Sequence, residues 1–438
     1  MKNIIAKIIF ITFDIAMIIL SIYLASLLRD TIGTFGTHTI SLYTYLTFYP
    51  IYIISLALFT YEGIYTHRYD FWHESRLIFK AIIFAAVLVF AYLAMTKSIE
   101  TYSRLVIGFA FIFMAFFIPL AKNISKKLLF NIGLWQKKAE IYGNDTFLVE
   151  EIYGNPYLGY IKPNVEEETS TVFINSKGWD IETLKQLLTN QIKQKDEVIF
   201  IPVINDYDLT LSHIYELSNT RTNLIIYKNR LKSSYRQVIQ CIFNYTLALL
   251  FLPLLLLIIG CIALLIKKES KGPIFFAHTR VGQKGKRIPA LKFRSMYHDA
   301  DVRLEKLLLE DPKIKKEWET NYKIKEDPRV TKVGAWLRKT SLDELPQIFN
   351  ILMGQMYFVG PRPVIQDEID EHYKKDAEYY HMVKPGITGL WQVSGRSDTD
   401  YDFRVATDKW YVLNWSLWLD IVILIKTFKV VFKREGAY

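Results

Sequence analysis

The chain has 438 residues, of which 51% are hydrophobic and 22% are charged, and its formal net charge is +10. This length suggests two or three domains, and a positive mean hydropathy beside so many charges excludes a single globular domain. The mixture indicates a membrane protein with sizeable soluble parts. The positive charge could attract nucleic acid, anionic lipid or an anionic substrate. The apolar segments favour the last two, so we expect no nucleic-acid partner.

Four apolar runs occupy the first third of the chain, at residues 4–28, 40–61, 77–96 and 103–121. Each is near the ~20 residues that a helix needs to cross a bilayer, and a buried helical bundle is the alternative interpretation. Basic residues gather before the first run, between the second and third, and after the fourth, where Lys122 and Lys126 follow. Cytosolic segments carry such an excess. We therefore expect a four-span α-helical membrane bundle over residues 1–130, with its N-terminus and everything after residue 122 in the cytosol.

Short strands and helices alternate over residues 131–232, which predicts a small α/β domain with a parallel sheet. The expected strands are Lys138–Tyr142, Thr171–Asn175, Glu197–Val203 and Asn223–Tyr227, and the expected helices are Ile181–Lys193 and Leu209–Ser218. A dinucleotide fingerprint needs several glycines after the first strand, and this chain offers Gly143 alone. We therefore favour a structural or regulatory domain over a cofactor site.

A fifth apolar run covers residues 237–266, and basic residues flank both of its ends. It is long enough to span a bilayer as a straight helix. Pro253 lies in its middle, where a proline removes a backbone hydrogen bond and kinks a helix. A helix that enters the membrane, breaks and returns fits both observations. We therefore expect a re-entrant helix here, and a mixed α/β domain over residues 233–438 on the cytosolic side.

A basic segment with two glycines follows at Thr279–Lys286, and it predicts a hairpin whose second strand runs over residues 288–296. For Lys284, Lys286 and Arg287 we favour a solvated basic surface near lipid headgroups over a binding role. The highly charged residues 299–325 predict a helical connector that faces solvent.

An adjacent carboxylate pair, Asp343–Glu344, lies between two arginines, Arg338 and Arg362. Such a set suits chemistry on a phosphate: a carboxylate nucleophile, an acidic partner able to hold a divalent cation, and guanidinium groups for phosphate oxygens. The prolines on both sides of Arg362 stiffen its backbone, which lowers the entropic cost of meeting a phosphate. Ser341 and Glu344 have the spacing of a capping box, so a helix start is the structural alternative for these two residues, and it would also favour an anion.

Two further segments complete the C-terminal region. Residues 383–397 contain several glycines and lack helical or strand periodicity, which predicts a functional loop. Residues Trp410–Phe432 combine tryptophans, apolar side chains and lysines, which predicts an amphipathic helix at the membrane interface. Asp420 is unusual within such a helix.

Over residues 237–438 these blocks resemble the bacterial sugar transferases, which are monotopic phosphoglycosyl transferases. The matching motifs are Arg-Val-Gly at 280–282, Lys-Phe-Arg-Ser-Met at 292–296, Asp-Glu at 343–344 and Pro-Arg-Pro at 361–363. The resemblance implies an enzyme that transfers a sugar-1-phosphate from a UDP-sugar to undecaprenyl phosphate, releases UMP and starts an O-antigen, capsule or exopolysaccharide. It also implies a re-entrant helix and a Rossmann-like middle domain. The long form of the chain resembles the branch that transfers a hexose, galactose or glucose.

The resemblance also implies roles for individual residues. Asp343 would be the nucleophile that carries the phosphosugar, and Glu344 would hold Mg²⁺ together with Asp343. Seven further residues would contact substrate or lie near the active site: Lys292, Arg294, Arg338, Arg362, Gln392, Arg396 and Asp420. For Asp420, a helix cap or an ion pair is an equal alternative.

From these features we expect a multi-pass protein of the bacterial inner membrane that forms a homodimer, contacts membrane lipid and has its catalytic domain on the cytoplasmic face. Two alternative functions stay open. A glycosyltransferase would move the sugar alone and leave UDP in place of UMP. A membrane scaffold would use the spans and the middle domain to bind partners in polysaccharide assembly.

Overall fold

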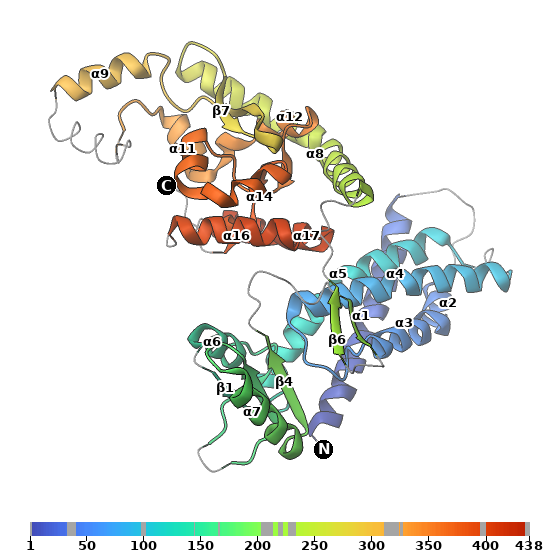
Figure 1. Cartoon of the computed structure of the whole chain (residues 1–438). Helices are drawn as coiled ribbons and strands as arrows, with labels where there is room; N and C mark the ends of the chain where they lie inside the picture. The colour runs from blue at the N-terminus through green and yellow to red at the C-terminus, as the bar shows by residue number, and fades with distance from the viewer. Residues whose placement is uncertain are drawn as a thin grey trace. The chain divides into compact units, whose positions relative to one another are not determined.

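A computed structural model describes residues 2–32, 41–97, 102–143, 145–164, 167–202, 213–217, 222–226, 234–310, 324, 327–394 and 400–433. The chain divides into two compact units, Met1–Ile204 and Asn205–Tyr438 (Figure 1). Each unit is described by itself below. The expected domain boundaries at residues 130 and 232 stay predictions.

The first unit begins with apolar helices. They are α1 (Lys2–Ile32), α2 (Leu42–Leu46), α3 (Tyr49–Tyr61), α4 (Phe71–Met95) and α5 (Arg104–Asn131). Four stretches of these helices are long and apolar enough to cross a membrane: Ile4–Thr31, Leu42–Tyr61, Phe71–Met95 and Arg104–Asn131. The second stretch is interrupted between α2 and α3, where Pro50 starts the new helix.

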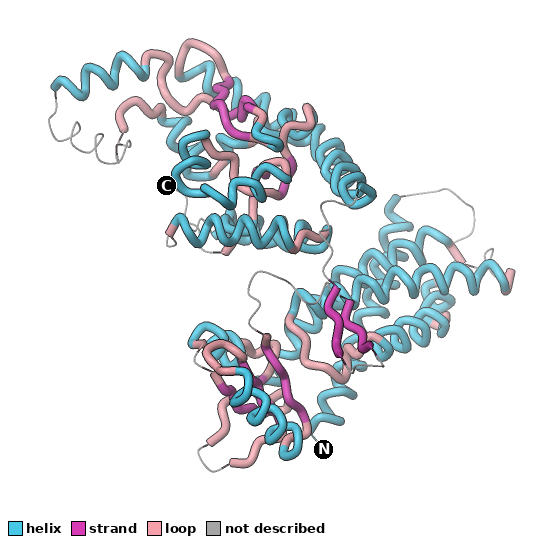
Figure 2. Tube along the Cα trace, in the orientation of Figure 1, coloured by secondary structure: helices cyan, strands magenta, loops and turns pink. Residues whose placement is uncertain are grey.

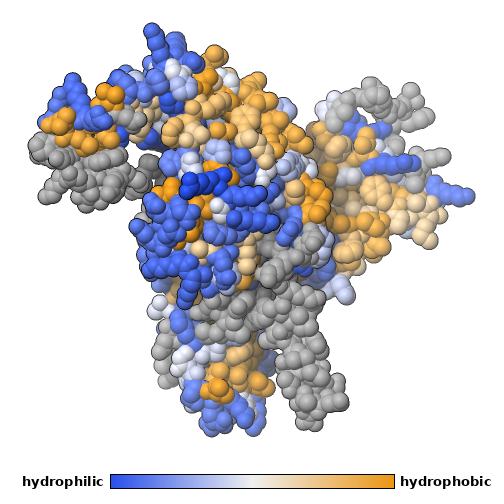
Figure 3. All heavy atoms as spheres, turned by 45° about the horizontal axis from the view of Figure 1, so that its top comes forward, coloured by the Kyte–Doolittle hydropathy of each residue, from blue (hydrophilic) through white to orange (hydrophobic). Residues whose placement is uncertain are grey.

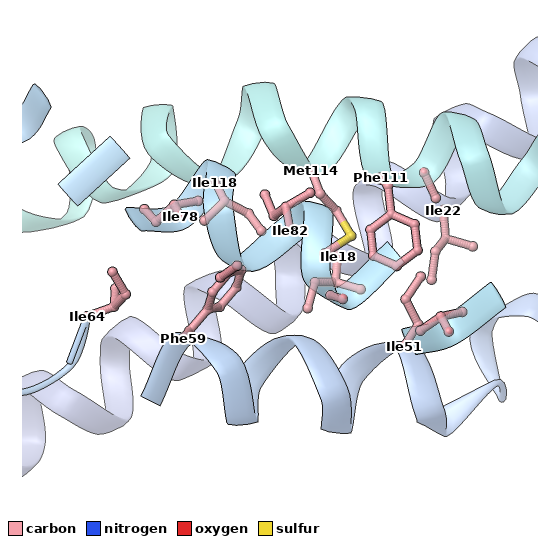
Figure 4. Close-up of a cluster of buried hydrophobic side chains, with 14 of the residues drawn as sticks. Ile18, Ile22, Ile51, Phe59, Ile64, Ile78, Ile82, Phe111, Met114 and Ile118 are labelled. Carbon is pink, nitrogen blue, oxygen red and sulfur yellow. The ribbon is translucent and has the colours of Figure 1, made fainter. Parts of the chain in front are cut away.

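Branched and aromatic side chains from α1, α3, α4 and α5 meet in one buried cluster (Figure 4). Ile18, Ile82 and Met114 lie at its centre, and Phe59 and Phe111 pack beside them. The outward faces of these helices are also apolar and exposed, and broad apolar areas are visible on the surface (Figure 3). Helices that are apolar on every side are typical of segments surrounded by lipid.

The fourth apolar run extends beyond its expected end, because α5 continues to Asn131 and two of its lysines are buried inside the unit. Lys122 Nζ lies 2.8 Å from Asp14 Oδ2 of α1, and Lys126 pairs with Glu74 of α4. These lysines are therefore helical and paired inside the unit, and the predicted cytosolic side of the residues after 122 stays a prediction. Each buried charge is tolerated because it has a counter-charge, and the partners lie too far away in sequence for a local pattern to reveal them.

Polar contacts join the helical bundle to the α/β region within the first unit. The Tyr157 hydroxyl donates to Glu74 Oε2 at 2.8 Å, and Glu74 lies in the first turn of α4. Arg68 Nη1 donates to three backbone carbonyls at 3.2, 2.9 and 3.1 Å, those of Trp135, Leu158 and Gly159. These buried bonds fix the α/β region to the end of the bundle where α4 begins.

The α/β region contains a four-stranded parallel sheet, which confirms the predicted sheet type. Its elements are β1 (Lys137–Tyr142), α6 (Thr146–Gly154), β2 (Tyr160–Ile161), β3 (Thr171–Asn175), α7 (Ile181–Gln194) and β4 (Glu197–Ile201), with strand order β2-β1-β3-β4. Gly143 follows β1 with φ 130°, and a Cβ there would lie 2.9 Å from Cβ of Asn175. The close approach of the ends of β1 and β3 thus explains this glycine without a bound pyrophosphate.

The expected helix Leu209–Ser218 is wrong over its described part. Residues His213–Leu217 form a strand, β5, which pairs antiparallel with β6 (Thr222–Ile226). The hairpin is separate from the parallel sheet, so the expected strand near 223–227 belongs to a different sheet. Cross-strand pairing with a neighbouring segment has overridden the local helical pattern, as often happens for short segments of mixed propensity.

The second unit is mixed α/β, as predicted (Figure 2). Its elements are α8 (Ser234–Glu269), β7 (Phe275–Val281), β8 (Arg287–Phe293), α9 (Ala300–Glu310), α11 (Lys332–Thr340), α12 (Gln347–Leu352), β9 (Tyr357–Val359), α13 (Gln366–Glu368), α14 (Ala377–Met382), β10 (Gly386–Thr388), α15 (Leu390–Val393), α16 (Tyr401–Leu413) and α17 (Leu417–Lys433). β7 and β8 form an antiparallel hairpin, as expected, and β9 and β10 form a parallel pair.

Two expectations for the C-terminal segments need correction. The segment 383–397 contains the strand β10 and the short helix α15, because β10 gains a partner in β9. The single amphipathic helix expected over Trp410–Phe432 is two helices, α16 and α17, which are separated at 414–416. Trp415 lies in this break and is buried, so it does not lie at a membrane surface.

Helix α8 has 36 residues, contains Pro253 and is the fifth helix, among the described residues, that is apolar enough for a membrane. Buried positions recur along one face on both sides of the proline: Gln240, Asn244, Ala248, Ile259, Ile262 and Ile266. The backbone N–H of Phe358 donates to Asn244 Oδ1 at 2.8 Å, and Ile262 belongs to the core around Leu337. Both halves of α8 therefore contact the same globular unit, while the other faces present exposed leucines.

Candidate active site

The carboxylate pair lies on a single 3₁₀ turn, Leu342–Glu344, between α11 and α12. Ser341 ends α11 in the left-handed conformation, with φ 56° and ψ 17°, and its side chain makes no capping hydrogen bond. The expected capping box is therefore wrong, and no long helix starts here to attract an anion. A left-handed serine is strained, and such strain is typical of functional turns.

The apolar helix α8 caps the start of α11. Glu269, its last residue, accepts hydrogen bonds from the backbone N–H groups of Lys332 at 2.7 Å and Val333 at 2.9 Å. Thr331 Oγ1 accepts the N–H of Gly334 at 2.9 Å. Three of the four free N–H groups at the start of α11 are thereby satisfied, two of them by a carboxylate that also suits the positive end of a helix.

Basic side chains from other segments surround the carboxylate pair. Lys292 on β8 lies 2.7 Å from Glu344 Oε1 and 3.6 Å from Asp343 Oδ2. Arg362 Nη2, from the Pro-Arg-Pro segment, lies 3.6 Å from the same oxygen of Glu344. Asn350 of α12 holds β8 in register, because its side chain bonds the backbone on both sides of Ala290. The structure thus brings together two predicted acids and two predicted bases.

Arg338 in the last turn of α11 completes the charged cluster. Its Nε donates to Ser295 Oγ at 2.9 Å, which fixes the guanidinium. Burial raises the pKa of Asp343, the positive charges of Lys292 and Arg338 lower it, and the charge of Glu344 raises it. The net direction is upward from the ordinary value. Asp343 is thus a poorly solvated carboxylate whose ionised form is favoured by neighbouring cations.

Arg294 lies apart from this cluster, although it is only two residues after Lys292. Its guanidinium donates to the carbonyls of Lys271 and Ser270, both at 2.8 Å. A Cβ at Gly272, where φ is 119°, would collide with this guanidinium. Arg294 therefore binds the chain that leaves α8, and its described contacts are structural.

Asp420 is a buried hydrogen-bond acceptor between helices. It accepts from the Tyr411 hydroxyl at 2.7 Å and from Trp415 Nε1 at 3.0 Å, and it bonds the side chain of Gln240 on α8. Burial raises its pKa to about 7. These contacts connect α16, α17 and α8, so the described surroundings of Asp420 are those of a structural residue.

The remaining two candidates are less defined. Gln392 is buried on α15, and its Nε2 donates to the carbonyl of Ile387 at 3.4 Å. Arg396 lies outside the described residues.

Sequence reasoning missed two groups beside the predicted site. Arg280 belongs to the Arg-Val-Gly motif, which contributed to the predicted hairpin and to the family resemblance but was given no role in the site, and the structure places its Nη1 3.7 Å from Glu368 Oε1. Glu368 also accepts from the Tyr401 hydroxyl at 2.6 Å. The motif itself was a usable signal for Arg280, whereas no local pattern singles out Glu368.

The described residues contain no group of three His, Cys, Asp or Glu side chains able to hold a metal ion. Mg²⁺ does not need such a group, since it is usually bound by one or two carboxylates, water and substrate phosphates. Asp343 and Glu344 are adjacent and supply two carboxylates of this kind, although Lys292 already contacts one oxygen of Glu344. The residues present fit a Mg²⁺ ion that takes its other ligands from phosphate and water.

Comparisons with known proteins place this geometry in context. The family described as bacterial sugar transferase matches residues 235–434. The chain is 37% identical over 411 residues to an undecaprenyl-phosphate galactose phosphotransferase of Salmonella typhimurium, covering 85% of this chain and 84% of that protein. It is 35% identical over 331 residues to a UDP-glucose:undecaprenyl-phosphate glucose-1-phosphate transferase of Escherichia coli, covering 70% of this chain and 68% of that protein.

A shorter relative matches less than half of this chain. The exopolysaccharide production protein ExoY of Rhizobium meliloti is 48% identical over 190 residues, which are 43% of this chain and 82% of that protein. The 190 aligned residues are close in number to the region that the family matches, residues 235–434.

Proposed function

The chain belongs to the bacterial sugar transferase family, and from that premise we propose that it transfers a hexose-1-phosphate from a UDP-sugar to undecaprenyl phosphate in a membrane. The product would start a surface polysaccharide. The observation that carries the proposal is the carboxylate pair Asp343–Glu344, held among Lys292, Arg338 and Arg362. The relatives named for galactose and glucose support a hexose.

The proposed reaction has two half-reactions at one site. A carboxylate oxygen of Asp343 attacks the β-phosphorus of the UDP-sugar, the new O–P bond forms, and the bond to the bridging oxygen breaks so that UMP leaves with the electron pair. A phosphate oxygen of undecaprenyl phosphate then attacks the same phosphorus, and Asp343 leaves as a free carboxylate. This double displacement is a ping-pong scheme.

Charge neutralisation is the main requirement, because both attacking groups and the phosphorus centre carry negative charge. Lys292 would hold the carboxylates in place, and Arg362 and Arg338 would accept the phosphate oxygens. A Mg²⁺ ion held by Glu344 and Asp343 would add further neutralisation of phosphate charge.

We also propose that four N-terminal spans and a re-entrant α8 anchor the protein in the bacterial inner membrane with its catalytic unit in the cytoplasm. Gln240 and Ile266 both contact the globular unit. They lie up to ~39 Å apart along α8, more than the ~30 Å of a bilayer's hydrocarbon core. A helix that crossed the bilayer could not keep both contacts with a unit on one side, which counts against a single span. The predicted break at Pro253 is not seen, since α8 is one uninterrupted helix, so the proposed re-entrance rests on these contacts.

The deciding experiment measures nucleotide release from UDP-galactose and UDP-glucose by the full chain in nanodiscs that contain undecaprenyl phosphate. Turnover should release UMP, and lipid-free incubation should leave sugar-phosphate on Asp343. Asp343→Asn should lower turnover about 10³-fold or more, because the amide is a poor nucleophile of nearly the same shape. Release of UDP would indicate a glycosyltransferase instead, and unchanged turnover by Asp343→Asn would overturn the assignment of the nucleophile.

A further inference from the structure

The end of β7 is clamped to the Pro-Arg-Pro segment that carries Arg362. The backbone N–H of Val281 donates to the carbonyl of Val364 at 2.8 Å. The buried Tyr380 hydroxyl donates to the carbonyl of Val281 at 2.9 Å and accepts the N–H of Val364 at 3.3 Å. The same hydroxyl lies 3.4 Å from the carbonyl oxygen of Arg362. Four bonds of this kind place Arg280, the neighbour of Val281, next to the Arg362 segment.

The Arg280 side chain is oriented by a carboxylate that is itself fixed. Arg280 Nη1 lies 3.7 Å from Glu368 Oε1, which also accepts the N–H of Ile365 at 3.3 Å. The second oxygen of Glu368 accepts the Tyr401 hydroxyl at 2.6 Å and lies 3.4 Å from Arg404 Nη1. Because four groups hold Glu368, its carboxylate is a rigid support, and removal of Arg280 alone leaves three of them in place.

Arg280 and Arg362 are close enough for their charges to repel. Burial lowers the pKa of Arg280, Glu368 opposes this effect, and the charge of Arg362 adds to it. Each arginine has a carboxylate of its own, Glu368 for Arg280 and Glu344 for Arg362. Two like charges held near each other by the backbone are stabilised when an anion binds between them.

We propose that Arg280 is a second arginine of the phosphate site, which binds phosphate oxygens of a substrate beside Arg362 and is positioned by Glu368. The inference rests on the proposed function and adds two residues to it. A guanidinium fork matches the spacing of phosphate oxygens, so two forks from adjacent segments can hold one phosphate or two linked phosphates. The phosphate could come from the nucleotide or from the polyprenyl phosphate, and the two sources are separable by experiment.

The test compares Arg280→Ala and Arg280→Lys with a matched control, Arg287→Ala, in full-length protein in nanodiscs. Arg287 is an exposed arginine at the start of β8, on the same hairpin. Three quantities are measured: the dissociation constant of UMP by calorimetry, the second-order rate constant for formation of the sugar-phosphate enzyme from the UDP-sugar without lipid, and KM for undecaprenyl phosphate. Loss of one charged hydrogen-bonding group should weaken the affected quantity about tenfold or more, and Arg287→Ala should stay within about twofold of wild type.

The pattern of loss identifies the phosphate. Weaker UMP binding and a slower lipid-free half-reaction would assign Arg280 to the nucleotide, whereas a raised KM for undecaprenyl phosphate alone would assign it to the lipid. Arg280→Lys should recover part of the loss, because it keeps the charge without the fork. If both Arg280 variants match Arg287→Ala in all three quantities, the inference is wrong.

Glu368 provides a separate test of positioning. Glu368→Gln should weaken the same quantity as Arg280→Ala, by about threefold to tenfold, and Glu368→Asp should recover part of it. Glu371→Gln is the matched control, since Glu371 is exposed nearby and its described partner is only His372 at 4.0 Å. A general loss of folding would instead lower the protein yield and all three quantities together.

Failure of the proposed function has a different signature from failure of this inference. If wild type released no UMP from any UDP-sugar, the reaction would be misassigned. UMP binding by the Arg280 variants would still decide whether Arg280 belongs to a phosphate site.

Discussion

Lys292 Nζ lies 2.7 Å from Glu344 Oε1, and this contact connects the strand β8 to the turn that carries Asp343. The same ammonium lies 3.6 Å from Asp343, so one charge holds both carboxylates in place. A cation shared by two adjacent acids keeps both ionised in a partly buried site.

Lys292→Met should make the enzyme more sensitive to acid. Burial raises the pKa of Asp343 and Lys292 lowers it, so loss of Lys292 leaves this pKa higher still. In the proposed reaction Asp343 must be ionised to attack phosphorus, and its ionised fraction falls as pH falls through that pKa. The acid limb of kcat/KM for the UDP-sugar should therefore move to higher pH in the variant. Lys284→Met, at an exposed position of the hairpin, is the control, and an unmoved acid limb in Lys292→Met would contradict the electrostatic role.

Glu344→Gln should weaken the dependence on metal. If Glu344 supplies a ligand to Mg²⁺, its amide replacement should raise the half-saturating Mg²⁺ concentration about tenfold or more. The measurement is a Mg²⁺ titration of UMP release after treatment with a chelator. Glu371→Gln should titrate like wild type, and the assignment fails if the two variants behave alike.

Both ends of α8 should be accessible from the cytosolic face. Tyr235→Cys and Ser270→Cys, introduced one at a time after replacement of Cys241 and Cys261 by alanine, test this in sealed vesicles with an impermeant thiol reagent. We expect both cysteines to react from the same side. Lys97→Cys, in the loop between α4 and α5, should react from the opposite side and serves as the control. Labelling of the two α8 positions from opposite sides would mean that α8 spans the membrane.

The buried pair Asp14–Lys122 should be important for the stability of the N-terminal unit. Asp14→Asn leaves the Lys122 ammonium buried without its counter-charge, which should cost about 3–5 kcal/mol of unfolding free energy. The double variant Asp14→Asn with Lys122→Met should recover most of this loss, because no charge remains. Asp30→Asn, an exposed position on the same helix, should have little effect. Unfolding is followed by heating in detergent, and equal melting temperatures for the single and double variants would argue against the pair.

Asp420→Asn should lower stability and change its pH dependence, with turnover per folded molecule unchanged. The folded pKa of about 7 lies above the ordinary 3.8, so the folded protein holds a proton that the unfolded chain releases as pH rises between these values. The unfolding free energy of wild type should thus fall from about pH 4 to about pH 7, and the variant should lack this slope. The asparagine has only one oxygen for the two donors Tyr411 and Trp415, so one hydrogen bond is lost, which should lower the unfolding free energy by about 1–3 kcal/mol. Loss of turnover without loss of stability would place Asp420 at the substrate.

Local patterns in the sequence predicted the elements whose causes are local. The parallel sheet followed from alternating strand and helix patterns, and the carboxylate pair and the proline-flanked Arg362 were visible because their residues are adjacent in the chain. The left-handed Ser341 was not predictable from the same residues, because the last turn of α11 is held by a bond from Arg338 to Ser295, which is distant in sequence.

Contacts between distant segments account for the other differences. Lys122 and Lys126 served in the sequence only as part of a basic excess after the fourth run, and their pairing with Asp14 and Glu74 could not be predicted from it. Arg294 is two residues after Lys292, so in a regular strand both side chains would lie on the same face. Arg294 lies just after β8 ends, and this regularity does not extend to it. The carbonyls at the end of α8 were available to it there.

The contact between Glu269 and the first turn of α11 has a consequence for how a lipid substrate is met. The apolar helix α8 caps the start of α11 through Glu269, and the far end of α11 leads directly into the turn with Asp343. With α8 in the membrane as proposed, the protein holds the Asp343 carboxylate at a fixed height relative to the lipid headgroups. Polyprenyl phosphate needs only to diffuse laterally to reach it, so the rate should follow the mole fraction of that lipid in the bilayer and not its amount per volume of solution.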